Sequence, residues 1–197
     1  MKHILQSQQG AMFGLDARIA LAIFAVISVV AGTAIAISMD STRAKALAQE
    51  MSDTGKAIES ISYDMRADLY PSLIQPSPKN AYTALFDVSV IKDENNLRGK
   101  WLGPYVHATS TSSRYGEMMI EARKASHADA CMEGEPCFLW LTYANVKRAI
   151  ALEVNSIIDG DKETDPAKTG RIQWVENADG TTLSLQAAKT LTYTGNN

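Results

Sequence analysis

The longest apolar run of the chain lies close to its N-terminus, from Ile19 to Ser38, and it contains no charged residue. A helix of about 20 residues spans roughly 30 Å, which is the apolar thickness of a bilayer. Small residues, among them Ser28, Gly32 and Thr33, are interleaved with Leu, Ile, Val and Phe. Such residues allow a second helix to approach closely. The run therefore predicts a helix that spans a membrane or packs in a helical bundle.

After Ser38 the pattern changes to a single apolar stripe on a charged helix. The apolar residues recur at steps of three, four or seven, which is the spacing of one helical face. They are Ala44, Leu47, Met51, Ile58, Ile61, Met65 and Leu69. Pro71 cannot continue a helix, and neither Pro nor Gly separates the two patterns. We therefore predict one helix from Met12 to Leu69, apolar all round over residues 12–39 and amphipathic over residues 40–70.

Residues 71–197 show shorter patterns that predict a globular head domain. The fold class expected for the whole chain is α+β, with the long N-terminal helix packed on a small antiparallel β-sheet. Strands are expected where β-branched and aromatic residues gather, and helices where apolar residues share a helical face. The expected strands are Tyr82–Ile91, the end of Trp101–Val106, Phe138–Tyr143, Arg171–Glu176, Thr181–Gln186 after a four-residue turn, and Leu191–Tyr193; the expected helices are Arg114–Ala130 and a segment that Asn145 caps and that ends at Ile158, with Val146, Ile150, Val154 and Ile157 on one face.

Composition and charge narrow the classes of function. A length of 197 residues leaves room for one membrane segment and one compact domain. A net charge of −3 provides no electrostatic reason to expect a nucleic-acid partner. The three histidines, His3, His107 and His127, are scattered, and no Gly-x-Ser-x-Gly, phosphate-binding glycine loop or His-Glu-x-x-His motif occurs. We expect no enzymatic activity and no catalytic residue.

The order of segments at the N-terminus is inverted relative to a secretory signal peptide. A polar leader, residues 1–11, ends in the small pair Gly10-Ala11 and precedes the apolar run, so cleavage there would leave the hydrophobic helix on the mature chain. A lone acid, Asp16, lies just ahead of the run. This order resembles the prepilin class, which comprises the type IV pilins and the pseudopilins of type II secretion. In that family a membrane peptidase cuts after a small residue, and the fifth mature residue is an acid.

Aligned on Asp16, the resemblance implies cleavage between Ala11 and Met12 and an N-methylated Met12 at the mature terminus. The sequence departs from the family pattern at several positions. Ala11 replaces the usual Gly at the cut, Asp16 replaces Glu, Arg18 occupies a normally apolar position, and Gly32-Thr33 stands where a proline usually breaks the helix. A cut after Gly10 instead would put Leu15 in the fifth position, out of register with the acid.

The position of Asp16 beside an apolar helix also predicts, without the resemblance, that its carboxylate needs a cationic partner. A carboxylate on a membrane-embedded helix costs about 2.5–3.5 kcal/mol at the bilayer centre and less near the interface, so it seeks a cation. The resemblance implies that a neighbouring subunit's terminal amine supplies this cation when the helices bundle. The alternative is that Asp16 caps the helix or reaches the interface beside Arg18, although residues two apart do not face each other on a helix.

The two cysteines, Cys131 and Cys137, enclose the turn formers Gly134 and Pro136. Their spacing fits neither a zinc site nor a Cys-x-x-Cys redox motif, so we predict a structural disulfide. Closing such a loop stabilises a fold by about 2 kcal/mol on the chain-entropy model. A disulfide also favours a head domain outside the cytoplasm.

An acidic loop follows the last predicted helix and is the one candidate for a metal. Its acids alternate with other residues, so an extended loop could gather their oxygens around a calcium ion; they are Asp159, Asp161, Glu163 and Asp165. The loop lacks the glycine position and the closing glutamate of an EF-hand, and solvated acidic turns are common. We expect no cofactor, with calcium as the alternative.

These patterns predict a structural subunit of a type IV pilus-like or secretion pseudopilus filament. Its expected partners are copies of itself or related pilins, a prepilin peptidase and an inner-membrane assembly platform. The chain would reside in the bacterial inner membrane before assembly and in a periplasmic or extracellular filament afterwards. The alternative is an unprocessed single-pass membrane protein whose ectodomain binds a ligand or a partner.

Overall fold

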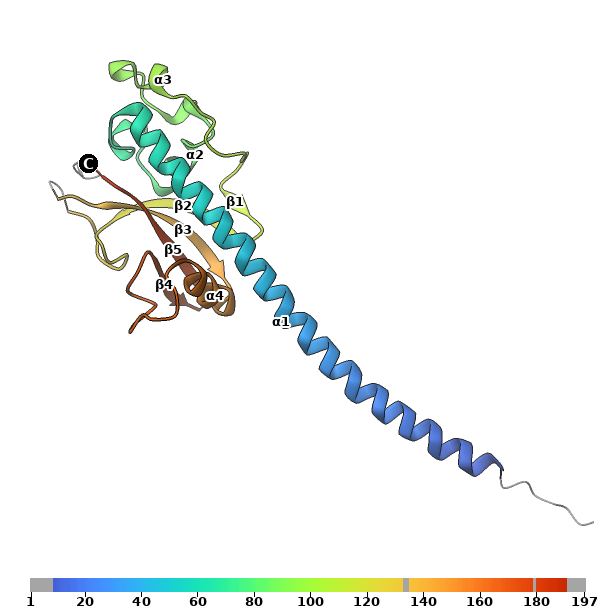
Figure 1. Cartoon of the computed structure of the whole chain (residues 1–197). Coiled ribbons are helices and arrows are strands. Elements are labelled where there is room, and N and C mark those ends of the chain that lie inside the picture. The colour runs from blue at the N-terminus through green and yellow to red at the C-terminus, as the bar shows by residue number, and fades with distance from the viewer. Residues whose placement is uncertain (1–8, 133–134, 179, 191–197) are drawn as a thin grey trace, which may run out of the picture. The chain divides into compact units, whose positions relative to one another are not determined.

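The computed structural model describes residues 9–132, 135–178 and 180–190. The chain divides into two compact units, Met1–Thr42 and Arg43–Asn197. Helix α1, Gln9–Met65, contributes its first part to one unit and its second part to the other (Figure 1). The second unit holds the remaining helices and all described strands, and we call it the head.

The head is built on a five-stranded antiparallel sheet in the order β1-β2-β3-β5-β4. The strands are β1 (Ser112–Ser113), β2 (Gly116–Arg123), β3 (Phe138–Val146), β4 (Ile172–Asn177) and β5 (Gly180–Lys189). Hairpins join β2 to β3 and β4 to β5, and β5 returns beside β3, so the two longest strands lie in the middle. The predicted α+β class with an antiparallel sheet is confirmed.

Helices cover one face of this sheet. The part of α1 from Arg43 onwards lies across it, with α2 (Pro78–Thr83) against β2 and α4 (Arg148–Ile158) against β4 (Figure 1). All seven residues of the predicted amphipathic stripe are buried with no exposed area. They pack with Ile120, Leu141 and Leu185 of the strands in one core. The amphipathic pattern therefore identified the helix face that the sheet buries.

The shorter helical elements connect α1 to the sheet. They are η1 (Tyr70–Ser72), η2 (Val88–Val90), η3 (Glu94–Asn96) and α3 (Leu97–Lys100). Helix α1 ends at Met65, one turn before the predicted Leu69, because Arg66 adopts a left-handed conformation with φ 50°. Leu69 is nevertheless fully buried, and Pro71 lies in η1.

The predicted strand Tyr82–Ile91 is wrong, because a helix begins just before it. Ser77 caps α2 by accepting a hydrogen bond from the Asn80 backbone N–H at 3.1 Å, and Pro78 occupies the first helical position. A serine cap followed by proline is a helix-start signal. The chain continues as turns and η2 rather than as a strand.

The predicted helix Arg114–Ala130 is also wrong, because this segment contains strand β2. Met118 and Ile120 alternate with more exposed neighbours, which is the period of a strand and not of a helix. The pairing of β2 with β3 settled the conformation, since it satisfies the backbone of residues 118–123. A methionine-rich face is compatible with a helix and with a strand.

Smaller differences concern segment ends. Trp101–Val106 contains no strand, because its polar groups bond to other loops: the Trp101 indole donates to the Ala84 carbonyl at 2.9 Å and the Tyr105 amide to the Leu85 carbonyl at 2.8 Å. Helix α4 starts after Lys147, since Asn145 has φ 64° and belongs to the end of β3. Ile150 and Val154 are buried on the predicted face of α4, whereas Ile157 is exposed.

Three of the remaining strand predictions are confirmed. β3 contains Phe138–Tyr143, and β4 and β5 form the predicted hairpin, although Asn177 pairs with Gly180 and the turn between them is therefore two residues long. The predicted strand Leu191–Tyr193 lies outside the described residues.

Candidate functional site

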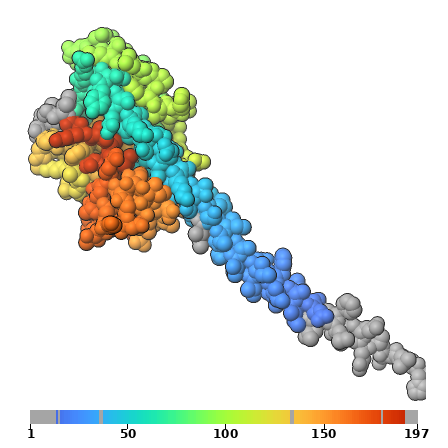
Figure 2. Space-filling model, viewed as in Figure 1, coloured from blue at the N-terminus to red at the C-terminus, as the bar shows by residue number. Residues whose placement is uncertain are grey.

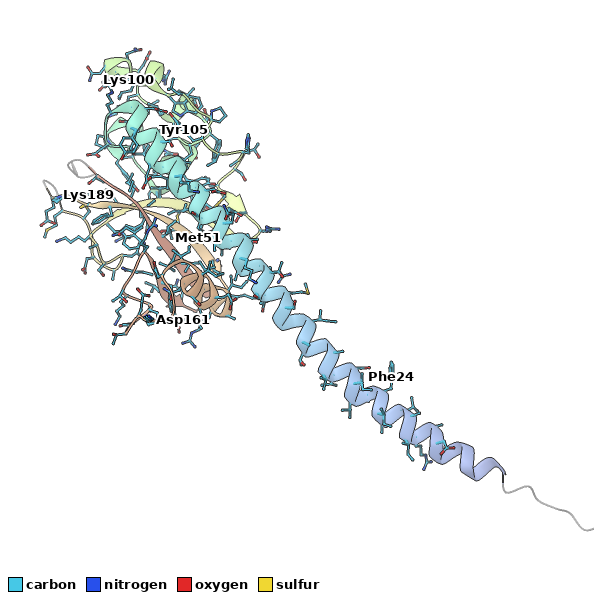
Figure 3. All side chains as sticks on the ribbon, in the orientation of Figure 1. Phe24, Met51, Lys100, Tyr105, Asp161 and Lys189 are labelled. Atoms are coloured by element: carbon cyan, nitrogen blue, oxygen red, sulfur yellow. A yellow bond between two sulfur atoms is a disulfide. The ribbon has the colours of Figure 1, made fainter. Side chains whose placement is uncertain are left out.

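The part of α1 from Asp16 to Ile35 carries exposed apolar side chains, and this is the principal candidate site. Every described side chain in this range is exposed. The large ones are Ile19, Leu21, Ile23, Phe24, Val26, Ile27, Val29, Val30 and Ile35, each with at least half of its area accessible. Figure 3 shows Phe24 projecting away from the helix, whereas Met51 lies on the buried stretch.

Among the described residues, α1 is the one helix that is long and apolar enough to cross a membrane. Two of its hydroxyl groups bond within the helix, since Thr33 donates to the Val30 carbonyl and Thr42 to the Ser38 carbonyl, both at 2.9 Å. Because lipid offers no hydrogen-bond partner, this internal bonding suits a helix in an apolar environment.

Asp16 and Arg18 lie at the start of this exposed segment, and both side chains are exposed. The predicted cleavage residues Gly10, Ala11 and Met12 belong to the first turn of α1, but their side chains lie outside the described part of the chain. The same holds for leader residues 1–8. Cleavage after Ala11, methylation of Met12 and the pairing of Asp16 therefore stay predictions.

The disulfide between Cys131 and Cys137 is confirmed, with the two Cα atoms 6.1 Å apart. It lies in the connection between β2 and β3, and Cys137 is fully buried at the start of β3. The backbone of Cys137 exchanges hydrogen bonds with the Thr190 hydroxyl at 3.0 and 3.1 Å. The bridge therefore ties the connection to the end of β5 as well as to itself.

The acids of the 159–165 loop have separate partners. Asp159 accepts a hydrogen bond from the Ile172 amide at 2.6 Å, Asp161 from the Ser156 hydroxyl at 2.5 Å, and Asp165 lies 3.6 Å from the Lys168 ammonium. Figure 3 shows Asp161 at the edge of the head. Within the described residues, no three His, Cys, Asp or Glu side chains gather in a group that could hold a metal ion.

A buried polar cluster on the second face of the sheet is a feature that sequence reasoning missed. The imidazole Nε2 of His127 lies 2.9 Å from Glu121 Oε2, 3.1 Å from Ser184 Oγ and 3.4 Å from Thr142 Oγ1. The His127 amide donates to Gln173 Oε1 at 2.9 Å. The sequence signal was slight, since Thr142, Gln173 and Ser184 are each a single polar residue between two apolar ones. Only strand pairing shows that they share one face.

The His127 cluster lacks the geometry of a nucleophilic triad. In a triad the acid and the nucleophile contact different nitrogens of the histidine, whereas here Glu121 and Ser184 meet the same one. Ser184 is also completely buried. The hydrogen bond from His127 lowers the pKa of Glu121, against the opposing effect of burial.

A second polar group lies between α1 and the sheet, beside an open hollow of about 540 Å³ that Glu50, Tyr82, Tyr105 and His107 help to line. Glu50 accepts a hydrogen bond from the Tyr143 hydroxyl at 2.9 Å. Burial, with a smaller effect of Glu50, raises the pKa of Tyr82 to about 12 and raises that of Tyr143 as well. The raised pKa values keep these phenols neutral at ordinary pH, and Tyr143 can therefore donate its hydroxyl proton to Glu50.

The fold and the exposed segment together define an α+β protein with one helix able to cross a membrane. Comparison with family models, curated proteins and solved structures finds no match to this chain. We therefore infer the function of the chain from its own residues and their arrangement.

Proposed function

We propose that this protein is a prepilin-like filament subunit: it is inserted in a membrane by α1, trimmed after Ala11 and then packed into a filament through the apolar part of that helix. Its role is mechanical, without catalysis. The head forms the outer surface of the filament.

One observation carries the proposal. α1 is apolar and exposed on all sides from Ile19 to Ile35, and it then buries a single stripe in the head from Ala44 to Met65. Burial of apolar area contributes roughly 25 cal/mol per Å², so the exposed part requires either lipid or other helices around it. When a subunit leaves the membrane, the core of a filament provides such helices around it. Small residues such as Gly32 allow these helices to pack closely.

Asp16 supports assembly over simple anchoring. In an apolar helical bundle its carboxylate needs a cation, and cleavage before Met12 would create an amine at the N-terminus of each neighbouring subunit. Pairing of these groups between subunits would set their axial register.

The first test is the mass of the N-terminal peptide of the chain recovered from membranes of cells that contain a prepilin peptidase. We expect a peptide that starts at Met12 and is heavier than its sequence by one methylene group, as N-methylation requires. A peptide that starts at Met1 would contradict the proposal and favour an unprocessed single-pass protein whose ectodomain binds a partner.

The second test separates assembly from insertion. Asp16→Ala is expected to leave cleavage and membrane insertion intact while the yield of sheared filaments falls at least about tenfold, since the paired charge is lost. Asp16→Glu, which keeps the carboxylate, is the matched control and is expected to assemble. Equal filament yields from the alanine and glutamate variants would remove the assembly role from Asp16.

A further inference from the structure

We propose that a basic groove in the head binds the phosphate group of an anionic membrane lipid. The groove has a volume of about 650 Å³ and lies where α1, the turn before β2 and the start of α4 meet. Arg43, Arg114 and Lys147 line it, and no Asp or Glu is among its lining residues. The inference rests on the membrane insertion in the proposed function but not on filament assembly.

The three cations come from different elements, and all three are exposed. The guanidinium of Arg114 lies 4.7 Å from the centre of the Tyr115 ring. Stacking on an aromatic ring orients a guanidinium and leaves its N–H edge available for a phosphate. A neighbouring cation, Arg148, pairs with Glu176 at 2.7 Å and does not line the groove.

The start of α4 adds backbone donors to the same groove. Lys147 is the N-cap of this helix and makes no side-chain cap, and its first turn contains no acid. The Ile150 amide already donates to the Lys147 carbonyl at 2.9 Å. The N–H groups before it have no partner within a helix, and together with the helix dipole they favour an anion. Lys147 and Ile150 of this turn both line the groove.

Tyr115 supplies an independent observation. Its side chain lines the groove and is 8% exposed, and its hydroxyl is the one buried side-chain N or O among the described residues without a hydrogen-bond partner. An unpaired buried hydroxyl costs about 1–3 kcal/mol, and a polar ligand in the groove would give it a partner. The apolar atoms of Val146 and Ile150 beside it suit the glycerol end of a lipid headgroup.

Chain connectivity favours a lipid over a free anion. Arg43 follows Ser38, the last residue of the apolar run, by five positions. A chain extends by at most about 3.6 Å per residue, so Arg43 stays within about 18 Å of the end of that run. Each cation close to an anionic membrane surface contributes about 1 kcal/mol of attraction.

The test uses the full chain in neutral detergent micelles, titrated with phosphatidylglycerol or phosphatidylcholine and read by native mass spectrometry. We expect a preference for phosphatidylglycerol that falls about fivefold in Arg114→Gln and in Lys147→Gln, and more than tenfold in the double variant. The matched control is Lys92→Gln/Lys100→Gln, which removes the same charge; Lys100 lies in α3, at the end of the head remote from α4 (Figures 1 and 3).

An equal preference in the double variant and the control would overturn the proposal. Displacement of the lipid by millimolar inorganic phosphate would also overturn it, since the ligand would then be a free anion. Stronger binding of a polyglutamate peptide than of phosphatidylglycerol would assign the groove to an acidic protein partner instead. Circular dichroism checks that each variant is folded. Resistance of the chain to alkaline extraction from membranes measures insertion separately, so a failure of membrane insertion is distinguishable from a failure of lipid binding.

Discussion

Glu121 and His127 are joined by a contact that is largely shielded from water, with side chains that are 18% and 9% exposed. Glu121 belongs to β2, and His127 lies six positions later in the connection from β2 to β3. The hydrogen bond from His127 is the largest cause of the lowered pKa of Glu121. A group whose pKa is lowered by folding makes stability depend on pH.

The sign of this dependence follows from the direction of the shift. The ionised Glu121 stabilises the fold above its ordinary pKa of 4.5, and this stabilisation is lost as the pH falls through the lowered value. We expect the free energy of unfolding to decrease on acidification below pH 4.5, and Glu121→Gln to flatten part of that decrease. Urea titrations of the full chain in detergent at several pH values measure both.

Glu117→Gln is the control for this experiment. Glu117 lies on the same strand, but its carboxylate is 41% exposed and pairs with Lys79 at the surface. Surface pairs contribute little to stability, so this variant is expected to keep the acid dependence of the parent chain. Parallel pH curves for Glu121→Gln and the parent chain would contradict the prediction.

At the scale of elements, Gly55 is a position where α1 packs directly on strand β5 of the sheet. A Cβ atom placed there would lie 3.3 Å from Leu185 Cδ2 and 3.9 Å from Ala187 Cβ. Glycine inside a helix costs about 1 kcal/mol relative to alanine, so its presence here reflects the space between helix and sheet. Gly32, on the same helix, has no atom within 4 Å of the equivalent position.

This pair of glycines provides a matched prediction. Gly55→Leu is expected to destabilise the head by about 1–3 kcal/mol, because the added side chain overpacks the core beside Leu185. Gly32→Leu is expected to leave the stability of the head unchanged. Thermal unfolding of the two full-length variants, followed by tryptophan fluorescence, tests the difference; equal melting temperatures would show that α1 does not pack on the sheet at Gly55.

At the scale of the whole molecule, the first unit carries exposed apolar side chains and the second unit contains the buried apolar core. The large apolar residues of 16–39 whose side chains are described are exposed (blue in Figure 2), whereas every residue of the core cluster is Ala44 or later. The head therefore contains all the apolar contacts of its own core, and the first unit contributes apolar surface. Such a head is expected to fold without the first unit.

Deletion of residues 1–42 tests this division. We expect the remaining chain to be soluble without detergent and to unfold cooperatively, because the deletion removes the exposed apolar surface and leaves the core complete. Size-exclusion chromatography and a urea titration measure the two properties. Aggregation of this chain, or gradual unfolding without a transition, would show that the head depends on the first unit.

The sequence by itself determined the features that depend on neighbouring residues along one element. The apolar run from Ile19 follows from length and composition, the stripe from Ala44 to Leu69 from helical periodicity, and the strand Phe138–Tyr143 from β-propensity. The disulfide followed from a Cys131–Cys137 spacing that is longer than those of a zinc site or a Cys-x-x-Cys motif. The exposed segment that carries the proposed function was accordingly visible before the fold was known.

The tertiary structure decided the features that depend on pairing between distant residues. Residues 116–123 form a strand because they hydrogen-bond with β3, although the spacing of their methionines is also compatible with a helix. The His127 cluster and the basic groove draw on residues from three or more separated elements. A local sequence pattern does not predict that these distant residues come together, because the free energy that favours their contact comes from burial and hydrogen bonding across the assembled sheet.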